Sequence, residues 1–279
     1  MKRESLEGKL LLVLLSAAWG GTFPVMKIAI LDLDVFFFLS LRFGVALLSF
    51  IPLLVLTKRK VIPDVRSMGI GIVVFSGFLF QVFGLKYTTA INSAFITSLN
   101  SPLVPVLGFL LFRKKPYLRA VFGIILGMIG LSLLTGAYRG IAVSLGDFLT
   151  FLCAISWALQ ILLVDMVTKE IDALELAYSE SLSVFVLSTI SSLAVGEKWL
   201  MPKGSGMLAV MYTGVIATTF AFFIQALSQE RVPPEITGLM LLLEPVFASF
   251  FSFLILGETL GNIETLGAFL ILLGIKISE

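Results

Sequence analysis

The sequence predicts an all-α membrane protein in which ten transmembrane helices form two inverted five-helix repeats around a central cavity. Of its 279 residues, 58% are hydrophobic and only 14% are charged, whereas a soluble domain carries about 25% charged residues. The apolar residues gather in ten runs, most of them close to the ~20 residues that a helix needs to cross ~30 Å of hydrocarbon. The two halves of the chain also resemble each other, which predicts the repeat.

The ten helices follow from the ten apolar runs, taken in order along the chain. The runs are too long for strands, and lipid admits only helices or closed barrels. Many of the loops between them are only a few residues long, so we expect the function to lie between the helices. The predicted spans are residues 10–30, 34–56, 67–86, 91–112, 118–136, 146–166, 173–195, 206–227, 236–256 and 262–278.

Matching helices of the two halves carry the same kinds of residue. Trp19 and Trp157 lie near the middle of the first and sixth helices, 138 residues apart. Pro102 and Pro245, in the fourth and ninth helices, are 143 residues apart. The fifth and tenth helices repeat a pair of glycines, which are Gly123 and Gly130 in one and Gly267 and Gly274 in the other.

An odd number of helices in each repeat inverts the second repeat. Residues 1–140 form the first repeat and residues 141–279 the second, within one integrated membrane domain. If each repeat crosses the membrane five times, the second enters from the opposite side. The repeats are then related by a pseudo-two-fold axis in the membrane plane, an arrangement typical of secondary transporters. We expect the fifth and tenth helices, which are apolar and glycine-spaced, at the periphery.

The lysines and arginines predict the orientation. With the N-terminus in the cytoplasm, 14 of them lie on the cytoplasmic side, five on the other side, and Arg42 inside a span. The positive-inside rule then predicts a multi-pass protein of the cytoplasmic (inner) membrane with both termini in the cytoplasm. The basic N-terminus before an apolar run also fits a signal peptide, but cleavage would leave nine helices and break the repeat.

Composition disfavours several function classes. The net charge of +2 argues against a nucleic-acid partner. The chain has no histidine and one cysteine, so we expect neither a metal nor a cofactor. No GxxxxGK[ST] loop is present, so this chain is not expected to hydrolyse ATP. The expected partners are the lipid bilayer and a small-molecule substrate, with a proton as the candidate coupling ion. Gly123 and Gly127 form a GxxxG element that fits helix packing or a dimer, so monomer and homodimer both stay open.

Three charged residues lie well inside predicted spans, which are Arg42, Glu180 and Glu244. Such residues cost about 2.5–3.5 kcal/mol each on insertion scales and usually serve a function. Arg42 and Glu180 are 138 residues apart, like the two tryptophans, and a vertical gap of ~7 Å separates them in a ~30 Å core. They are predicted to meet near the midplane in at least one state and to bind substrate or switch partner. A static ion pair or two snorkelling side chains are the structural alternatives.

Glu244 precedes Pro245, which removes a backbone hydrogen bond and opens the ninth helix locally. This position predicts a carboxylate that carries a proton, with a hydrogen-bonded structural Glu as the alternative. Further polar and aromatic residues inside the spans are candidates for lining a cavity, although packing between helices is again the alternative. These candidates are Trp19, Thr22, Gln81, Asn92, Asn100, Trp157, Gln160, Tyr178 and Gln225.

Several segments resemble EamA-type members of the drug/metabolite transporter superfamily. The segment SAAWGGTFPVMK (residues 16–27) is similar to their first helix, NSPLVPVLGFLLFRKKP (100–116) to their fourth, and LLLEPVFASFFSFLILGETLGNIETLGAFLILLG (241–274) to their last two. The resemblance implies alternating access, a central cavity and efflux or uptake of small metabolites. The first half departs from the pattern, because Arg113-Lys114-Lys115 stands where the second half has Leu256-Gly257-Glu258. We expect Glu258 to cap the tenth helix.

Together these observations predict a secondary active transporter rather than an enzyme. It would move an amino-acid-like or drug-like metabolite across the cytoplasmic membrane by alternating access, as an exporter. A membrane-embedded enzyme and a passive channel for small solutes remain as alternatives. Against the enzyme, the sequence offers no histidine, no metal cluster and no paired nucleophile and base. Against the channel, the polar residues inside the spans are sparse.

Overall fold

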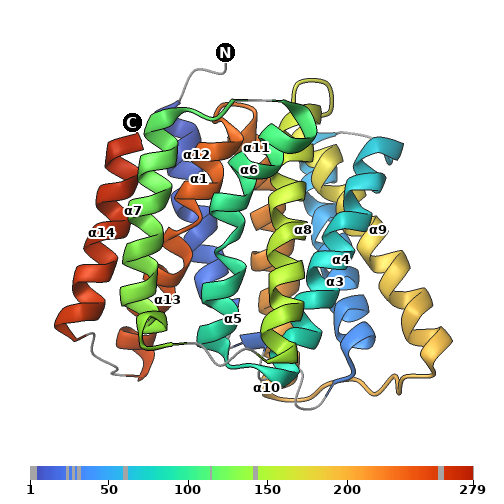
Figure 1. Ribbon diagram of the computed structural model, residues 1–279. Coiled ribbons are helices and arrows are strands. Elements are labelled where there is room, and N and C mark those ends of the chain that lie inside the picture. The colour runs from blue at the N-terminus through green and yellow to red at the C-terminus, as the bar shows by residue number, and fades with distance from the viewer. Residues whose placement is uncertain are drawn as a thin grey trace.

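The computed structural model describes residues 5–22, 25–26, 29, 33–58, 62–113, 115–140, 144–256 and 261–278. Every regular element of these residues is a helix (Figure 1). Eight helical segments within the described residues are long and apolar enough to cross a membrane. The predicted class, an all-helical multi-pass membrane protein, is therefore confirmed.

The helices follow one another with short connections. The first half contributes α1 (Leu6–Gly20), α3 (Val35–Thr57), α4 (Val65–Tyr87), α5 (Ala90–Thr97), α6 (Asn100–Phe112), α7 (Leu118–Thr135) and the short η1 (Ala137–Arg139). The second half contributes α8 (Leu145–Val167), α9 (Ala173–Val195), α10 (Ser205–Met211), η2 (Tyr212–Phe220), α11 (Ala221–Gln229), α12 (Pro234–Met240), α13 (Leu243–Leu256) and α14 (Asn262–Ser278).

Side-chain caps set where several of these helices begin. Ser144 and Asp147 form a reciprocal capping box at the start of α8, which satisfies two backbone groups that a helix terminus otherwise leaves open. Asp64 accepts hydrogen bonds from the N–H groups of Arg66 and Ser67 at the start of α4. The Ser67 N–H in particular stabilises the ionised form and holds the pKa of Asp64 below its usual value.

The fourth and ninth predicted spans, 91–112 and 236–256, are found as residues 92–112 and 234–251, and each is broken into two helices. The first break separates α5 from α6 at residues 98–99, and the second separates α12 from α13 at residues 241–242. The cause is a proline just after each break, Pro102 and Pro245, whose ring clashes with the carbonyl four residues earlier. The N–H groups of Ser101 and Glu244 instead bond three residues back, to Ser98 and Leu241.

α7 and α14 pack closely along one edge of the bundle (Figure 1), where the sequence placed the fifth and tenth helices. Glycines make the approach possible. A Cβ added to Gly123 would lie 2.5 Å from the carbonyl oxygen of Gly274, and one added to Gly130 would lie 2.6 Å from that of Gly267. These distances are too short for any side chain, so the backbones touch directly. The GxxxG element therefore serves packing within the chain.

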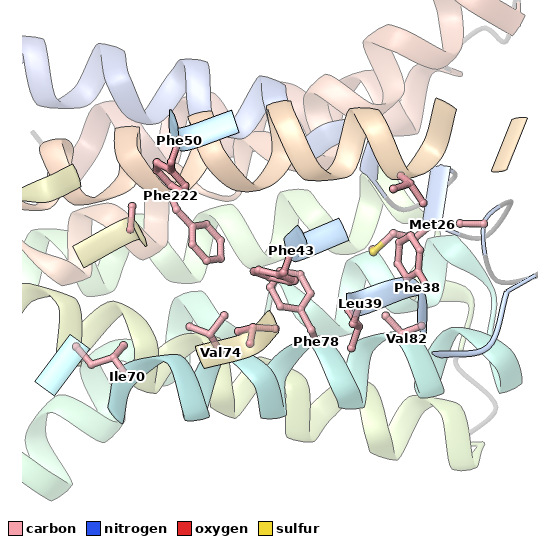
Figure 2. Close-up of a cluster of buried hydrophobic side chains, with 14 of the residues drawn as sticks. Met26, Phe38, Leu39, Phe43, Phe50, Ile70, Val74, Phe78, Val82 and Phe222 are labelled. Carbon is pink, nitrogen blue, oxygen red and sulfur yellow. The ribbon is translucent and has the colours of Figure 1, made fainter. Parts of the chain in front are cut away.

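The larger apolar core lies between α3, α4, α9 and α11. Figure 2 shows Phe43, Phe78 and Phe222 facing one another in this core, with Met26 near one end. The Phe43 and Phe78 rings meet edge to face with centroids 5.2 Å apart, a favoured geometry for aromatic pairs. Met26 and Phe78 also border the central cavity, so the core ends where the cavity begins.

Candidate functional site

A narrow central cavity lies between the two halves of the bundle, with room for water over about 40 Å³. Helices from both halves line it. Nine of the twelve residues proposed from the sequence face this cavity, which are Trp19, Thr22, Arg42, Gln81, Asn100, Trp157, Gln160, Gln225 and Glu244. The remaining lining residues are Met26, Phe78, Thr97, Ile161 and Leu241.

Arg42 in α3 is the most deeply buried charged residue of the cavity wall, with 1% of its surface exposed. Its Nε donates to the hydroxyl of Thr218 over 2.9 Å, and its Nη2 donates to the carbonyl of Ala217 over 3.3 Å. The guanidinium also lies 4.3 Å from the ring centroid of Phe78, within cation–π range. These contacts fix the guanidinium in place without neutralising it.

The π-helix η2 supplies the carbonyl that anchors Arg42. At its end, the N–H of Ala221 donates to the carbonyls of Ile216 and Thr218 and skips that of Ala217. The Ala217 carbonyl can therefore also accept the indole N–H of Trp19, over 2.9 Å. π-helical turns are rare and often mark functional sites, and here the turn joins α1 and α3 to η2.

Aromatic rings form the apolar part of the cavity wall. Trp19 and Trp157, which occupy matching positions in the two halves, have ring centroids 6.5 Å apart. Phe78 meets Trp157 edge to face at 4.8 Å. Both tryptophans lie well inside the bundle rather than at a membrane interface, where tryptophan is usually enriched. These rings pack on one another and present an apolar face to the cavity.

Glu244 brings a carboxyl group to the same cavity. It lies in the first turn of α13, directly after the break at 241–242, and its side chain is only partly covered by protein. It forms no ion pair with Arg42 in the described structure, although both residues border the cavity. The cavity thus presents a fixed cation and an acidic group that are not paired with each other.

Glu180 lies outside this cavity, behind its wall. The α9 carboxyl group is 2% exposed and interacts electrostatically with the side chain of Gln160. Gln160 in turn accepts from Nε2 of Gln225 over 2.9 Å. Arg42 and Glu180 do not pair in this structure, because the guanidinium is directed to Thr218 and Ala217 instead. The predicted contact between them is therefore absent from this conformation.

Asn92 and Tyr178 do not reach the cavity. Asn92 lies in the first turn of α5, where its backbone N–H bonds to the capping Thr89. The Tyr178 ring packs edge to face on Phe50, with centroids 5.8 Å apart. Glu258 and Gly257 lie outside the described residues, so the predicted cap of the last helix is not placed.

The sequence missed the lining residues that are apolar. Phe78 and Leu241 each lie three residues before a predicted one, Gln81 and Glu244. Met26 lies four residues after Thr22. Residues three or four apart share a helix face, so helical spacing from the polar candidates could have found them. Within the described residues, no group of three His, Cys, Asp or Glu could hold a metal ion.

Comparison with known proteins identifies the family. The model of the EamA-like transporter family matches residues 6–136 and again residues 144–278. The chain belongs to the EamA-like transporter family. An uncharacterized transporter of Archaeoglobus fulgidus is 34% identical over 95% of this chain and 83% of its own length. A probable amino-acid metabolite efflux pump of Salmonella typhimurium is 24% identical over 96% of this chain and 93% of its own length.

The fold comparison agrees with the family. A solved protein structure superposes on 97% of this chain and 95% of its own, with a TM-score of 0.82 at 19% identity. At that identity the likeness concerns the fold alone. The family relatives are named as transporters, so this EamA-like protein is a membrane transporter for a small molecule and not an enzyme.

Proposed function

We propose that this EamA-like transporter is a secondary active transporter that exports a small amino-acid-like metabolite by alternating access. The observation that carries the proposal is the cavity itself, which presents Arg42 and Glu244 without pairing them. A zwitterion carries a counter-charge for each of these two residues. Its carboxylate would match the guanidinium of Arg42, and its ammonium group would match the carboxyl group of Glu244.

The aromatic wall favours an apolar or aromatic side chain on the substrate. Trp19, Trp157 and Phe78 line the same cavity as the two charged residues. Ligand pockets usually measure about 300–1,000 Å³, whereas this cavity has room for water over only about 40 Å³, so alternating access must widen it before a substrate binds. The proposed substrate class is therefore a zwitterionic amino acid with an apolar side chain, or a metabolite of the same chemistry.

Alternating access requires two halves that can exchange roles, and several contacts support such a pair. Gly123 contacts Gly274, while Gly130 contacts Gly267. Gly267 and Gly274 are the counterparts of Gly123 and Gly130, so the contact set maps onto itself when the halves are exchanged. Such reciprocal contacts are typical of a two-fold relation. Residues 1–140 and 141–279 would then be the two inverted repeats, with ten spans in total.

The two broken helices support the same proposal. Each break lies 143 residues from the other, and each is followed by a half-helix that begins beside the cavity, α6 at Asn100 and α13 near Glu244. Discontinuous helices at the interface of inverted repeats commonly form the substrate site of secondary transporters. Export as the direction of flux is supported by the relative that is named as an efflux pump.

Both termini are proposed to lie in the cytoplasm, with the protein in the cytoplasmic membrane. The distribution of lysine and arginine supports this orientation, and α1 begins on the side of the bundle where α14 ends (Figure 1). A reporter that is active only in the cytoplasm, fused after Glu279, is expected to be active. An inserted but inactive fusion would contradict the orientation.

The transport proposal is tested with purified protein in liposomes. A panel of amino acids, nucleosides and cationic drugs is offered with and without a pH gradient. We expect amino acids with apolar side chains to be moved against their concentration gradient when the proton gradient is imposed. Flux that only runs downhill would favour a passive channel, and movement of cationic drugs alone would contradict the proposed substrate class.

A further inference from the structure

Glu180 is a buried acid that the proposed substrate site does not use. Its carboxyl group is 2% exposed and does not line the cavity. One oxygen, Oε1, has no hydrogen-bond partner among the described residues. The side chain of Gln160 is the polar group that interacts with the carboxyl group. Buried polar atoms without a partner are rare in folded proteins and call for an explanation.

No described cation neutralises Glu180. α9 packs against α3, α4, η2 and α11. On α3, Arg42 is directed to Thr218 and Ala217. On α4, Arg66 pairs with Glu170 and Lys86 lies over the Phe83 ring. The remaining titratable groups of the elements around Glu180 are neutral or acidic, and they are Tyr87, Cys153, Asp147, Asp165, Glu175, Tyr178 and Tyr212.

An ionised carboxylate in this position would be a buried and unpaired charge. The cost of burying such an ion is several kcal/mol, whereas a protonated carboxyl group needs only hydrogen bonds. In the conformation described here, Glu180 therefore holds a proton. Its proton can be released only when a conformational change brings water or a cation to the carboxyl group.

Gln160 connects this acid to the substrate cavity. Its amide contacts Glu180 on one side and borders the cavity on the other. It also exchanges hydrogen bonds with Gln225, which borders the cavity as well. A substrate that takes a hydrogen bond from the Gln160 amide removes that partner from Glu180. Occupancy of the cavity and protonation of Glu180 are thus linked through the side chain of Gln160.

We propose that Glu180 binds the proton that drives transport and that Gln160 couples its protonation to occupancy of the substrate cavity. The inference rests on the proposed transport function and divides the two acids by role. Glu244 faces the substrate, while Glu180 takes up one proton from water on one side of the membrane. After the conformational change the carboxyl group returns that proton to water on the other side, and its O–H bond is the only bond that forms and breaks.

The protonation of Glu180 is tested by infrared difference spectroscopy of the purified protein titrated with acid and base. A buried protonated carboxyl group gives a C=O stretching band that a Gln side chain lacks. We expect the band in the wild-type protein and in Glu175→Gln, a control on the same helix, and its loss in Glu180→Gln. A band that survives unchanged in Glu180→Gln would overturn the proposal.

The coupling is tested in liposomes with leucine and phenylalanine as probes. A gradient of one pH unit is worth about tenfold accumulation for one proton per substrate. We expect Glu180→Gln to lose this accumulation while it still exchanges labelled for unlabelled substrate at about the wild-type rate, since Gln mimics the protonated acid. Gln160→Leu should likewise reduce accumulation more than exchange and alter the pH profile. Accumulation at the wild-type level in Glu180→Gln would overturn the proposal.

The transport measurements also distinguish a failure of this inference from a failure of the proposed function. A wild-type protein that moves none of the offered amino acids, by exchange or uphill, would overturn the proposed function. The infrared band would still report on the proton at Glu180 in that case. Loss of both exchange and accumulation in Glu180→Gln, with the folded protein intact, would assign Glu180 to substrate movement itself and overturn its role as a separate proton site.

Discussion

The α7–α14 pair and the central cavity differ in packing: the pair is closed by direct backbone contact, whereas the cavity leaves polar groups open to a ligand. In the pair, Gly130 and Gly267 let two backbones touch, and no space for a side chain remains at these two positions. In the cavity, Arg42 and Glu244 border empty space and are not paired with each other. The pair has one tight arrangement, whereas the cavity has charges left available for a ligand. Close packing and ligand recognition therefore reside on different helices. Variants of the pair should impair folding, and variants of the cavity should impair transport.

Arg42→Met is expected to have the largest effect, and on transport rather than folding. Losing one partner of a buried charge-assisted contact costs about 2–5 kcal/mol, so transport should fall by a factor of about 30 or more. No described carboxylate is stranded by the change, so the folded yield should stay close to wild type. Proteoliposome uptake and size-exclusion profiles measure both. Arg139→Met, at an exposed arginine near Glu264, is the matched control.

Gly130→Ala is expected to damage folding instead. The new methyl group would lie 2.6 Å from the Gly267 carbonyl oxygen and 2.8 Å from the backbone nitrogen of Ile271. Neither backbone atom can move aside easily, and overpacking of this kind costs about 1–3 kcal/mol. Thermal unfolding in detergent should show a lower midpoint. Gly69→Ala, where nothing lies within 4 Å, should leave the midpoint unchanged, and equal losses in both variants would remove the distinction.

Trp19→Phe is expected to have a moderate effect on transport. The change keeps an aromatic ring but removes the hydrogen bond from the indole N–H to Ala217. Such a bond contributes about 0.5–1.5 kcal/mol, so transport should fall about two- to tenfold. Trp199→Phe removes an equivalent bond, to Ser192, away from the cavity. Uptake assays should separate the two variants, and equal losses would mean that the position of Trp19 at the cavity does not matter for transport.

The smallest expected effect is the coupling between Arg42 and Glu180. Because the two residues do not pair in this conformation, the stability changes of Arg42→Met and Glu180→Gln should add to within about 0.5 kcal/mol. A double-mutant cycle on unfolding in detergent measures this. A coupling well above that value would mean that a conformation in which the two side chains meet dominates in solution.

Sequence alone predicted the class of fold and most of the cavity, for one physical reason. Polar and charged side chains are costly in lipid, so Arg42, Gln81 and Glu244 stand out against apolar runs and mark an interior surface. The apolar wall carries no such signal. Phe78 and Ile161 look like any other lipid-facing or core residue until the helix face of Gln81, and that of Trp157, is considered.

The remaining errors concern local backbone and partner choice. A local opening was predicted beside Pro245 but not beside Pro102, because the extent of a break depends on how the two half-helices pack. The carbonyl that accepts from Arg42 could not be predicted. It is made available by a π-helix, and no residue type in the sequence predicts a π-helix there. Tyr178 and Asn92 are polar, yet one packs in the core and the other begins a helix.

The proposed substrate recognition depends on Glu244, which is expected to bind the ammonium group of a zwitterionic substrate. Binding of phenylalanine and of 3-phenylpropanoate, which lacks only the amino group, is measured by calorimetry on wild type and on Glu244→Gln. We expect wild type to prefer phenylalanine, by about 2–5 kcal/mol if the ammonium–carboxylate contact is desolvated, and Glu244→Gln to lose most of that preference. Wild-type discrimination retained in Glu244→Gln would contradict the claim.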